Sequence, residues 1–356
     1  MRSTRLCLSD FDTNQAMTAT HKTRRNFIAG LGALIASAPF VSRSAQTGER
    51  APRIDVHHHV SFPRFDQALK AEGVRTVPWT VEQSVAEMDK SGIALAVTSL
   101  IQPSVSFGDM ALGRALSREA NEFGARLVRE HPGRFGAFGT IPYADTEGSL
   151  KEIEYALDTL RLEGFQLMTS YSGKYPGDPV FWPVLEELNR RSAVVYTHPL
   201  VPACCGSTVP GVSPGTIEYA TDTTRTIASL LFSGAAARFS NIRWIFSHSG
   251  GTMPFLLSRF LQEERLMKDK SEKLPKGLMY ELAKFYYDTA QGNHAGALSA
   301  LVKIAPISQI LYGTDYPFRG GAEENAGLAA YGFTAAELRA IDRENALKLM
   351  PRLAKS

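Results

Sequence analysis

The chain has 356 residues, 44% of them hydrophobic and 21% charged, a composition typical of globular proteins that excludes a disordered or fibrous chain. The formal net charge of +3 comes from the N-terminus, because residues 1–44 hold six basic and two acidic residues. The remaining 33 basic and 34 acidic residues nearly cancel, so we predict neither a nucleic-acid partner nor binding to an anionic membrane.

The N-terminal stretch "KTRRNFIAGLGALIASAPFV" joins the pair Arg24 and Arg25 to a short run rich in alanine and glycine. This run is too short to span a bilayer as a stable helix, so we predict no stable membrane anchor. The stretch resembles a twin-arginine export signal. We therefore predict a leader over residues 1–44, export to the periplasm, and a single domain over residues 45–356. A basic leader followed by an amphipathic segment is the alternative.

From Pro52 onward, short apolar runs alternate with helical patterns. Eight strands alternating with helices predict a parallel sheet closed into an α/β fold, the (β/α)8 barrel of the TIM type. A doubly wound open sheet is the alternative, although no G-x-G-x-x-G opens the first helix. Thr146 is expected to cap the helix in "TEGSLKEIEYALDTLRLEG". The predicted strands are Ile54–Val60, Ile93–Leu100, Phe135–Ile141, Gly164–Met168, Ala193–Thr197, Ile242–Phe246, Phe285–Tyr287 and Ile310–Tyr312.

Three consecutive histidines end the first predicted strand in "RIDVHHHVSF". Successive side chains of a strand point to opposite faces, so His57 and His59 share one face and His58 points the other way. Two imidazoles at this spacing form half of a metal site.

Three further polar residues lie at the ends of predicted strands. His198 in "AVVYTHP" follows the fifth strand, His248 in "IRWIFSHSGG" the sixth, and Asp315 in "ILYGTDYPF" the eighth. A barrel gathers its active site at the C-terminal ends of its strands. Together with the first histidine pair, these residues predict a site for one divalent metal ion, zinc or alternatively manganese.

Two adjacent cysteines, Cys204 and Cys205, lie shortly after the fifth strand. Neighbouring Cα atoms are too close for a relaxed disulfide, so we predict that the two cysteines stay unpaired. We favour packing as small apolar residues over a role as soft groups near the metal. Further along, Asp222 is expected to cap the helix opened by "DTTR", and the role of Arg225 is left open.

The segments "DVHHH", "HPGRFGAFGTIP", "THP", "SHSGG" and "YGTDYPF", in this order, carry a resemblance to a known family. The chain resembles the amidohydrolase superfamily, in the branch that includes aminocarboxymuconate semialdehyde decarboxylase and γ-resorcylate decarboxylase. Within this branch, "DTTRTIASLLFSG" and the cysteine pair make it similar to 6-methylsalicylate decarboxylases. The resemblance runs from about Arg53 to Leu353.

This resemblance implies that His57, His59, His198 and Asp315 ligate the metal. His248 would stand beside the metal and act on the substrate or on a water molecule. It also implies a carboxy-lyase that acts on a small aromatic carboxylate.

Many hydrolytic members of the superfamily bind two metals, bridged by a carboxylated lysine at the end of strand four. Here that strand reads "GFQLMTSYSG" and ends in Met168 and Thr169, and Lys174 is too far along to take this role. A single metal ion follows, as in the decarboxylase branch.

Decarboxylation needs a proton at the ring carbon that carries the carboxylate. Asp315 is the candidate donor, and His248 would polarise the phenol or activate water. A metal-dependent hydrolase of a lactone or an amide could use the same residues, and an exported metal-binding protein without activity is a further alternative.

Arg259 lies eleven residues after His248 on a predicted helix. In the decarboxylases that the chain resembles, an arginine at this place reaches the site of a neighbouring subunit and pairs with a substrate carboxylate. The resemblance therefore implies that Arg259 binds substrate in a homodimer or higher homo-oligomer; a solvated helix arginine is the alternative.

Overall fold

The computed structural model describes residues 52–206 and 208–354. The predicted export leader, with Arg24 and Arg25, lies outside the described residues. Among the residues described, no helix combines the length and apolar character that crossing a bilayer requires.

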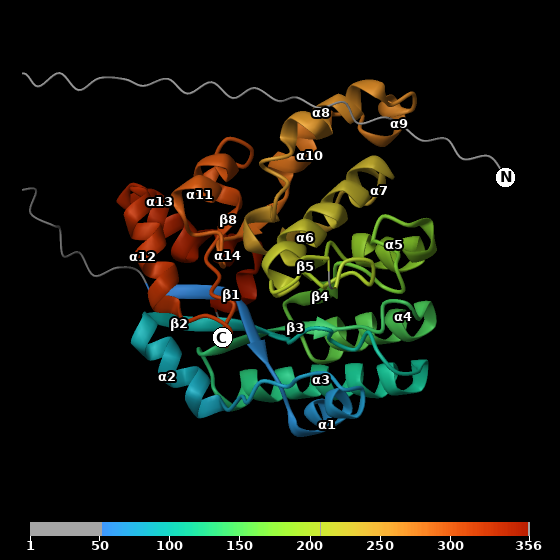
Figure 1. Ribbon diagram of the computed structural model, residues 1–356. Coiled ribbons are helices and arrows are strands. Elements are labelled where there is room, and N and C mark those ends of the chain that lie inside the picture. Colours follow the sequence, from blue (N-terminus) through green and yellow to red (C-terminus); the bar gives the residue numbers. More distant parts are fainter. Residues whose placement is uncertain (1–51, 207, 355–356) are drawn as a thin grey trace, which may run out of the picture. The chain divides into compact units, whose positions relative to one another are not determined.

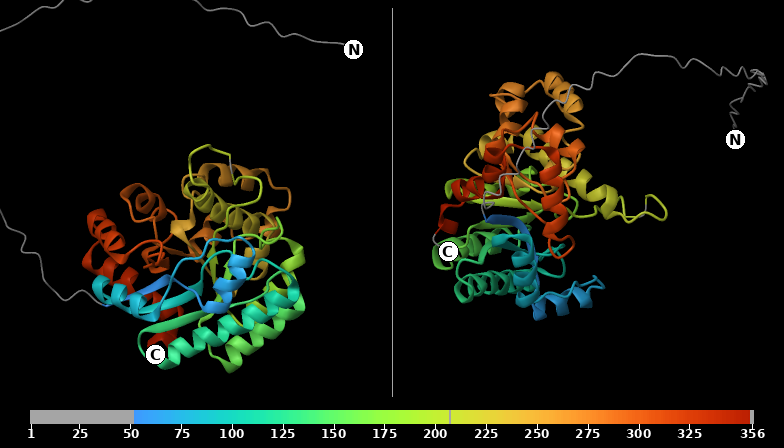
Figure 2. Two further views of the ribbon diagram at one scale, coloured as in Figure 1. Left: turned by 60° about the horizontal axis from the view of Figure 1, so that its bottom comes forward. Right: turned by 90° about the vertical axis from the view of Figure 1, so that its left-hand side faces the viewer.

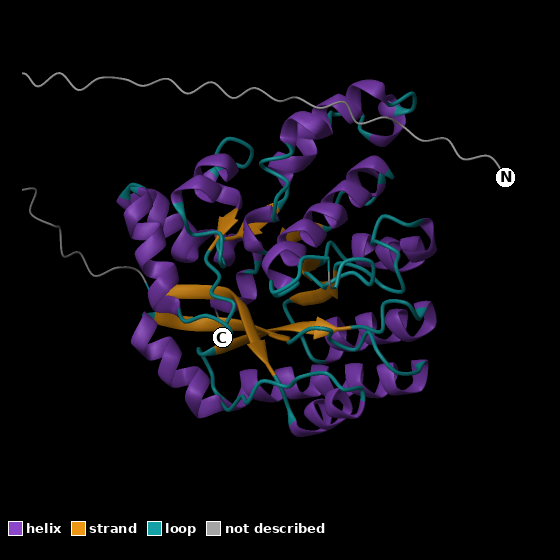
Figure 3. Cartoon of the chain, viewed as in Figure 1, coloured by secondary structure: helices purple, strands orange, loops and turns teal. Residues whose placement is uncertain are grey.

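Eight parallel strands follow one another around the sheet in sequence order, and helices cover their outer side (Figures 1 and 3). The strands are β1 (Arg53–Val60), β2 (Ile93–Leu100), β3 (Phe135–Thr140), β4 (Gly164–Met168), β5 (Val194–His198), β6 (Arg243–Phe246), β7 (Tyr286–Asp288) and β8 (Ile310–Leu311). This order confirms the predicted TIM-type barrel and excludes the doubly wound alternative, in which the strand order would reverse.

Backbone hydrogen bonds join the first strand to the last and close the ring. The amide of Val56 donates to the carbonyl of Tyr312 over 3.0 Å, and the amide of His59 donates to that of Tyr316 over 2.7 Å. The first strand and the segment after the last therefore lie side by side at the mouth of the barrel.

The helices are α1 (Pro63–Ala71), α2 (Val81–Ser91), α3 (Met110–Glu130), α4 (Thr146–Glu154), α5 (Trp182–Arg190), α6 (Gly215–Phe232), α7 (Ala235–Arg238), α8 (Leu257–Leu266), α9 (Lys270–Lys273), α10 (Leu278–Lys284), α11 (Ala295–Leu301), α12 (Gly321–Tyr331), α13 (Ala335–Arg339) and α14 (Asn345–Leu349). One apolar cluster fills the space between strands and helices. A second lies inside the ring, where Ile54 and Val56 meet residues of α14, so the C-terminal helix seals the lower end of the barrel.

Two predicted helix caps are wrong. Asp145, not Thr146, caps α4, because its carboxylate accepts from the amide of Gly148 over 3.0 Å. Asp222 lies inside α6, which begins seven residues earlier, and its buried carboxylate instead accepts from the hydroxyl of Tyr175 over 2.6 Å.

The prediction that the two cysteines stay unpaired is also wrong. Cys204 and Cys205 form a disulfide in the loop between β5 and α6, although their Cα atoms are only 3.8 Å apart. This separation is below the usual range for a disulfide, which is why the sequence predicts unpaired cysteines. Cys204 is exposed, so neither packing nor metal binding describes it. The right-hand view of Figure 2 shows this part of the chain, in yellow, extending away from the strands.

Candidate metal centre

A β-bulge in β1 directs the side chains of His57 and His59 into the barrel. The three-residue step from Asp55 to His58 opposes the two-residue step from Ala96 to Thr98 on β2, so β1 carries one extra residue. As a result, the apolar side chains at the start of β1 face the inside of the barrel, and so do those of His57 and His59 near the C-terminal end of the same strand. His58 points outward, as predicted.

The five predicted residues meet at the C-terminal ends of the strands. The ring centre of His198 lies 5.3 Å from that of His57 and 4.5 Å from that of His59. The ring of His248 lies 5.0 Å from that of His57, and Asp315 closes the group from the segment after β8. The structure therefore brings together all four predicted ligands and the residue expected beside the metal.

Hydrogen bonds at Nδ1 fix the tautomer of each predicted histidine ligand. His57 Nδ1 lies 2.9 Å from Asp288 Oδ2, His59 Nδ1 lies 3.2 Å from the carbonyl of Leu100, and His198 Nδ1 lies 3.1 Å from the carbonyl of Pro199. Each acceptor requires a proton on Nδ1, so the lone pair of the neutral imidazole, the form that binds a metal, lies on Nε2. Metal-binding histidines are held in this way in other proteins.

These lone pairs converge on one point together with a carboxylate oxygen. The Nε2 atoms of His57 and His59 are 3.1 Å apart, and each lies 3.2 Å from Asp315 Oδ1. Three acceptors at such distances repel one another unless a cation stands between them. One atom each of His57, His198, His248 and Asp315 also lies within 4.8 Å of the others, so His248 is close enough to compete with His59 as a ligand. The donor set suits a divalent metal of the zinc type.

The electrostatics of the site favour a positive charge. Burial opposes protonation of His57, but Asp288 and Asp315 outweigh it and raise the pKa of His57 to about 10. Burial lowers the pKa of His59 and, with repulsion from the neighbouring imidazoles, holds that of His198 well below its usual range. Burial also opposes ionisation of Asp315, but His57 and the other imidazoles hold the pKa of this carboxyl well below its usual value.

A tight turn presents His248 to the site. His248 and Ser249 both have positive φ angles, 54° and 56°, and the two glycines of "SHSGG" follow. At Gly251 a Cβ atom would stand 2.0 Å from the carbonyl oxygen of Ala220, so only glycine allows this approach to α6. The His248 ring is thereby placed with Nε2 3.4 Å from Asp315 Oδ2.

The end of β4 offers no bridging lysine. Met168 is fully buried, and Thr169 Oγ1 accepts from the amide of Leu200 over 2.9 Å and donates to Asp222. Lys174 instead pairs with Asp178 over 3.4 Å. These contacts fit the expectation of a single metal ion.

A cavity of about 630 Å³ opens from the metal centre between the loops that follow β2, β5, β6, β7 and β8. His198, His248 and Asp315 form part of its floor, and Gln102 and Tyr219 contribute to its walls. A substrate the size of a substituted benzoate fits this volume, because small-molecule sites begin at roughly 300 Å³.

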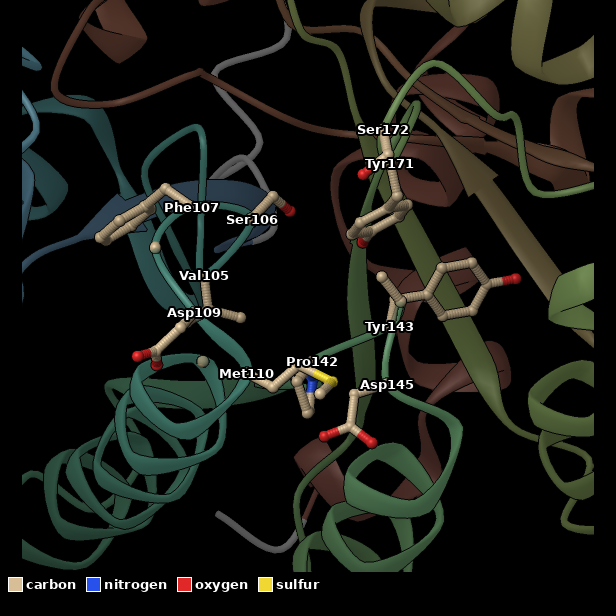
Figure 4. Close-up of a pocket in the computed structure, with 13 residues that line it drawn as sticks. Val105, Ser106, Phe107, Asp109, Met110, Pro142, Tyr143, Asp145, Tyr171 and Ser172 are labelled. Atoms are coloured by element: carbon tan, nitrogen blue, oxygen red, sulfur yellow. The ribbon is translucent and has the colours of Figure 1, made fainter.

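A smaller cavity of about 160 Å³ lies between the loops after β2, β3 and β4 (Figure 4). In Figure 4, Val105 and Phe107 line one side of it, and Tyr143 and Tyr171 lie across from them. None of the five strand-end residues lines this cavity, so we assign the chemistry to the larger one.

Several residues of the site escaped the sequence analysis. Asp288 follows two tyrosines at the end of β7 and has no distinctive spacing from the histidines. Gln291 donates from Nε2 to Asp315 Oδ2, and His294 and Arg319 line the larger cavity. The strand-end position of Asp288 was the one signal that could have identified it.

Arg259 lies on α8 and is exposed. It does not line the cavity of its own chain.

The sequence matches the amidohydrolase family over residues 54–352. A decarboxylase of Aspergillus niger is 32% identical over 326 residues, which cover 84% of this chain and 88% of that protein. The 6-methylsalicylic acid decarboxylase of Aspergillus aculeatus is 34% identical over 325 residues, 85% of this chain and 97% of that protein. These matches confirm the resemblance that the motifs carry.

Solved structures share the fold. The 5-carboxyvanillate decarboxylase of Novosphingobium aromaticivorans, in complex with manganese and 4-hydroxy-3-methoxy-5-nitrobenzoic acid, matches with a TM-score of 0.75 at 19% identity. The match covers 84% of this chain and 96% of that chain. At this identity the likeness concerns the barrel alone.

Proposed function

Because this chain belongs to the amidohydrolase family, we infer that it is a metal-dependent, non-oxidative decarboxylase of a small phenolic or aromatic carboxylic acid, 6-methylsalicylate-like in kind. The observation that carries this function is the convergence of His57 Nε2, His59 Nε2 and Asp315 Oδ1, with His198 close by, at the floor of a cavity that admits a benzoate. Relatives that cover most of the chain are decarboxylases, which supports a carboxy-lyase.

The proposed ligands of the single divalent ion are His57, His59, His198 and Asp315, with His248 beside it. Zinc suits this nitrogen and oxygen set, and manganese is the alternative. When bound, the ion supplies a Lewis acid that holds the carboxylate and the neighbouring phenolic oxygen of the substrate and stabilises negative charge on them.

Asp315 and His248 are placed to move the proton. Both residues line the larger cavity, and Asp315 Oδ2 lies 3.4 Å from His248 Nε2. We assign to Asp315, which the neighbouring imidazoles hold ionised, the transfer of a proton from the phenolic hydroxyl of the substrate to the ring carbon that bears the carboxylate. The bond from this carbon to the carboxylate then breaks, its electron pair restores the aromatic ring, and CO₂ leaves. His248 orients the phenolic oxygen by hydrogen bonding.

We further propose that Arg259 completes the site of a neighbouring subunit in a homodimer or higher homo-oligomer. Its exposure on α8 leaves the guanidinium accessible for that contact. A guanidinium can bind a carboxylate through two parallel hydrogen bonds.

The proposal of periplasmic export through the twin-arginine route rests on the sequence of residues 1–44. A fusion of residues 17–50 to a folded reporter should reach the periplasm. Replacing Arg24 and Arg25 with lysine should retain the reporter in the cytoplasm, and unchanged export would contradict this route.

Incubation of the purified protein with a panel of hydroxybenzoates and a panel of lactones and amides tests the function. We expect CO₂ from at least one hydroxybenzoate, 6-methylsalicylate among the candidates, and none after removal of the metal. Opening of a lactone or amide, with no CO₂ from any acid, would replace the decarboxylase with the hydrolase.

A further inference from the structure

Gln291 forms a hydrogen bond with only one of the two oxygens of Asp315. Oδ1 of Asp315 lies 3.2 Å from Nε2 of both His57 and His59, and among the described residues it has no hydrogen-bond donor. Oδ2 instead accepts from the side-chain amide of Gln291 and lies 3.4 Å from His248 Nε2. The two oxygens therefore have separate surroundings. Oδ1 belongs to the proposed ligand set, and Oδ2 contacts two residues that line the larger cavity.

A tight turn after β7 brings Gln291 to this position. Gln291 has a positive φ angle of 52°, and the amide of Gly292 donates to the carbonyl of Thr289 over 2.9 Å. A Cβ atom at residue 292 would stand 2.2 Å from Ser249 Oγ and 2.7 Å from the Cβ of Ser249, so glycine lets this turn pack against the turn that carries His248. A residue other than glycine seldom adopts such a φ angle unless its surroundings impose it, and such residues cluster at functional sites.

The amide of Gln291 occupies one lone pair of Oδ2 and leaves the other for a proton. Each oxygen of an ionised carboxylate can accept two hydrogen bonds, and only the NH₂ side of an amide can face it, because the amide oxygen would repel it. Gln291 carries no charge, so it holds Oδ2 in place without the ion pair that a lysine or an arginine would form there. A carboxylate in an ion pair takes up a proton less readily.

We propose that Gln291 is a positioning residue that keeps Oδ2 of Asp315 apart from the proposed ligand atoms and available to carry the proton. A carboxylate can bind a cation with one oxygen or with both. If both oxygens of Asp315 turned to the ion, neither would be free to take the proton from the phenolic hydroxyl and pass it to the ring carbon. The hydrogen bond from Gln291 opposes that rotation. This inference rests on the proposed function, in which Asp315 transfers the proton.

The variant Gln291→Leu removes the amide and roughly preserves the size of the side chain. We expect kcat for CO₂ release to fall about 10- to 100-fold, as for a reacting group that is no longer held in place, while KM stays close to that of the wild type. Gln83→Leu, at an exposed position of α2, is the matched control and should keep the kcat of the wild type. Thermal unfolding of both variants checks that they are folded.

Metal binding separates this role from a general contribution to the fold. Replacing a residue that merely supports the site would loosen the proposed ligands and lower metal affinity. For Gln291→Leu we expect competition with a chelator to give an affinity at least equal to that of the wild type, because Oδ2 can then join Oδ1 at the ion. Loading with Co²⁺ gives a second measurement. Its visible absorption should be weaker in Gln291→Leu than in Gln83→Leu, since cobalt with an additional ligand absorbs less strongly.

The outcomes keep the two proposals apart. A kcat of Gln291→Leu equal to that of the wild type, or a fall in kcat accompanied by an equal fall in metal affinity, overturns this inference and leaves the decarboxylase in place. No CO₂ from the wild type with any acid removes the decarboxylase function and, with it, the role of Gln291 in proton transfer.

Discussion

Asp288 and His57 form a buried pair in which the imidazole Nδ1–H donates to carboxylate Oδ2 over 2.9 Å. The other oxygen of Asp288 accepts from the backbone amide of His248 over 2.9 Å. One carboxylate thus orients a proposed metal ligand and holds the turn that carries the proposed catalytic imidazole.

Replacing this carboxylate should weaken both functions. In Asp288→Asn one of the two acceptor oxygens becomes an NH₂ group. This donor then faces another donor, either the imidazole N–H of His57 or the backbone amide of His248, and that hydrogen bond is lost. We expect metal affinity to fall about 10- to 100-fold, as for other residues that orient a metal ligand. Competition with a chelator measures the change. Asp109→Asn, at the exposed cap of α3, is the matched control, and equal affinity in both variants would contradict the role of Asp288.

Substitutions of His57 and His58 should separate metal binding from stability. His57→Ala should remove most of the bound metal, measured by elemental analysis after gel filtration. His58→Ala should retain the metal but lower the free energy of unfolding by about 2–4 kcal/mol. The loss follows because His58 bonds Ser84 over 2.6 Å and stacks on Tyr316 with ring centres 4.5 Å apart. Metal loss from His58→Ala alone would contradict the assignment of ligands.

His248 tests the chemical step. His248→Ala should keep one metal ion per chain and lose on the order of 10²-fold or more in kcat, the scale of a positioned acid–base group. In D₂O, the wild-type product should carry deuterium at the carbon that bore the carboxylate. A variant that loses its metal would instead make His248 a ligand, in line with its distance to the other donor atoms.

Much of the barrel could be predicted because each strand is a short apolar run with its own local signal. The predicted strands agree with β2 and β4 at both ends and with the others within one residue at each end. His57 and His59 followed from strand alternation, and the bulge in β1 leaves that alternation intact over the three histidines.

The remaining parts of the site depend on partners that are distant in the sequence. Asp288 and His57 are 231 residues apart in the chain, and they form a hydrogen bond only because β7 and β1 belong to the same barrel. The sequence predicts Asp222 as a cap because "DTTR" reads as the start of a helix, whereas α6 begins at Gly215 without a capping side chain. The hydrogen bond from Gln102 to Tyr219 joins the loop after β2 to α6, which are 117 residues apart in the chain.

Arg259 offers a test of shared sites. If it serves a neighbouring subunit, Arg259→Ala and His248→Ala should each be nearly inactive alone. Mixed oligomers of the two variants should regain activity, because some sites then hold both intact residues. Subunit exchange followed by a CO₂ assay measures this recovery. Full activity of Arg259→Ala would identify it as a solvated helix residue.

Glu163 should make stability depend on pH. Burial raises the pKa of Glu163 from 4.5 to about 7, and Arg352 only partly offsets it. Between about pH 4.5 and pH 7 the carboxyl of Glu163 therefore keeps its proton in the folded protein and releases it in the unfolded chain. The contribution of Glu163 to the free energy of unfolding is fully present below about pH 4.5 and is lost as the pH rises through about 7. The loss is at most about 3 kcal/mol. We expect the free energy of unfolding, measured by urea titration, to decrease less from pH 5 to pH 8 in Glu163→Gln than in the wild type. Equal decreases in the two proteins would contradict this role of Glu163.

The closure of the barrel between its first and last strands has a consequence for biogenesis. Asp55 accepts hydrogen bonds from Thr314, 259 positions away, and the proposed ligands His57 and Asp315 come from the same two segments. A ribosome must therefore release nearly the whole chain before the ligand set can assemble, and contacts of such long range form slowly. A cation that binds only the closed ring stabilises that state by mass action and no earlier intermediate. Metal binding at the proposed site would thus stabilise only the completely folded chain. Chains truncated before Asp315 would lack one of the proposed ligands.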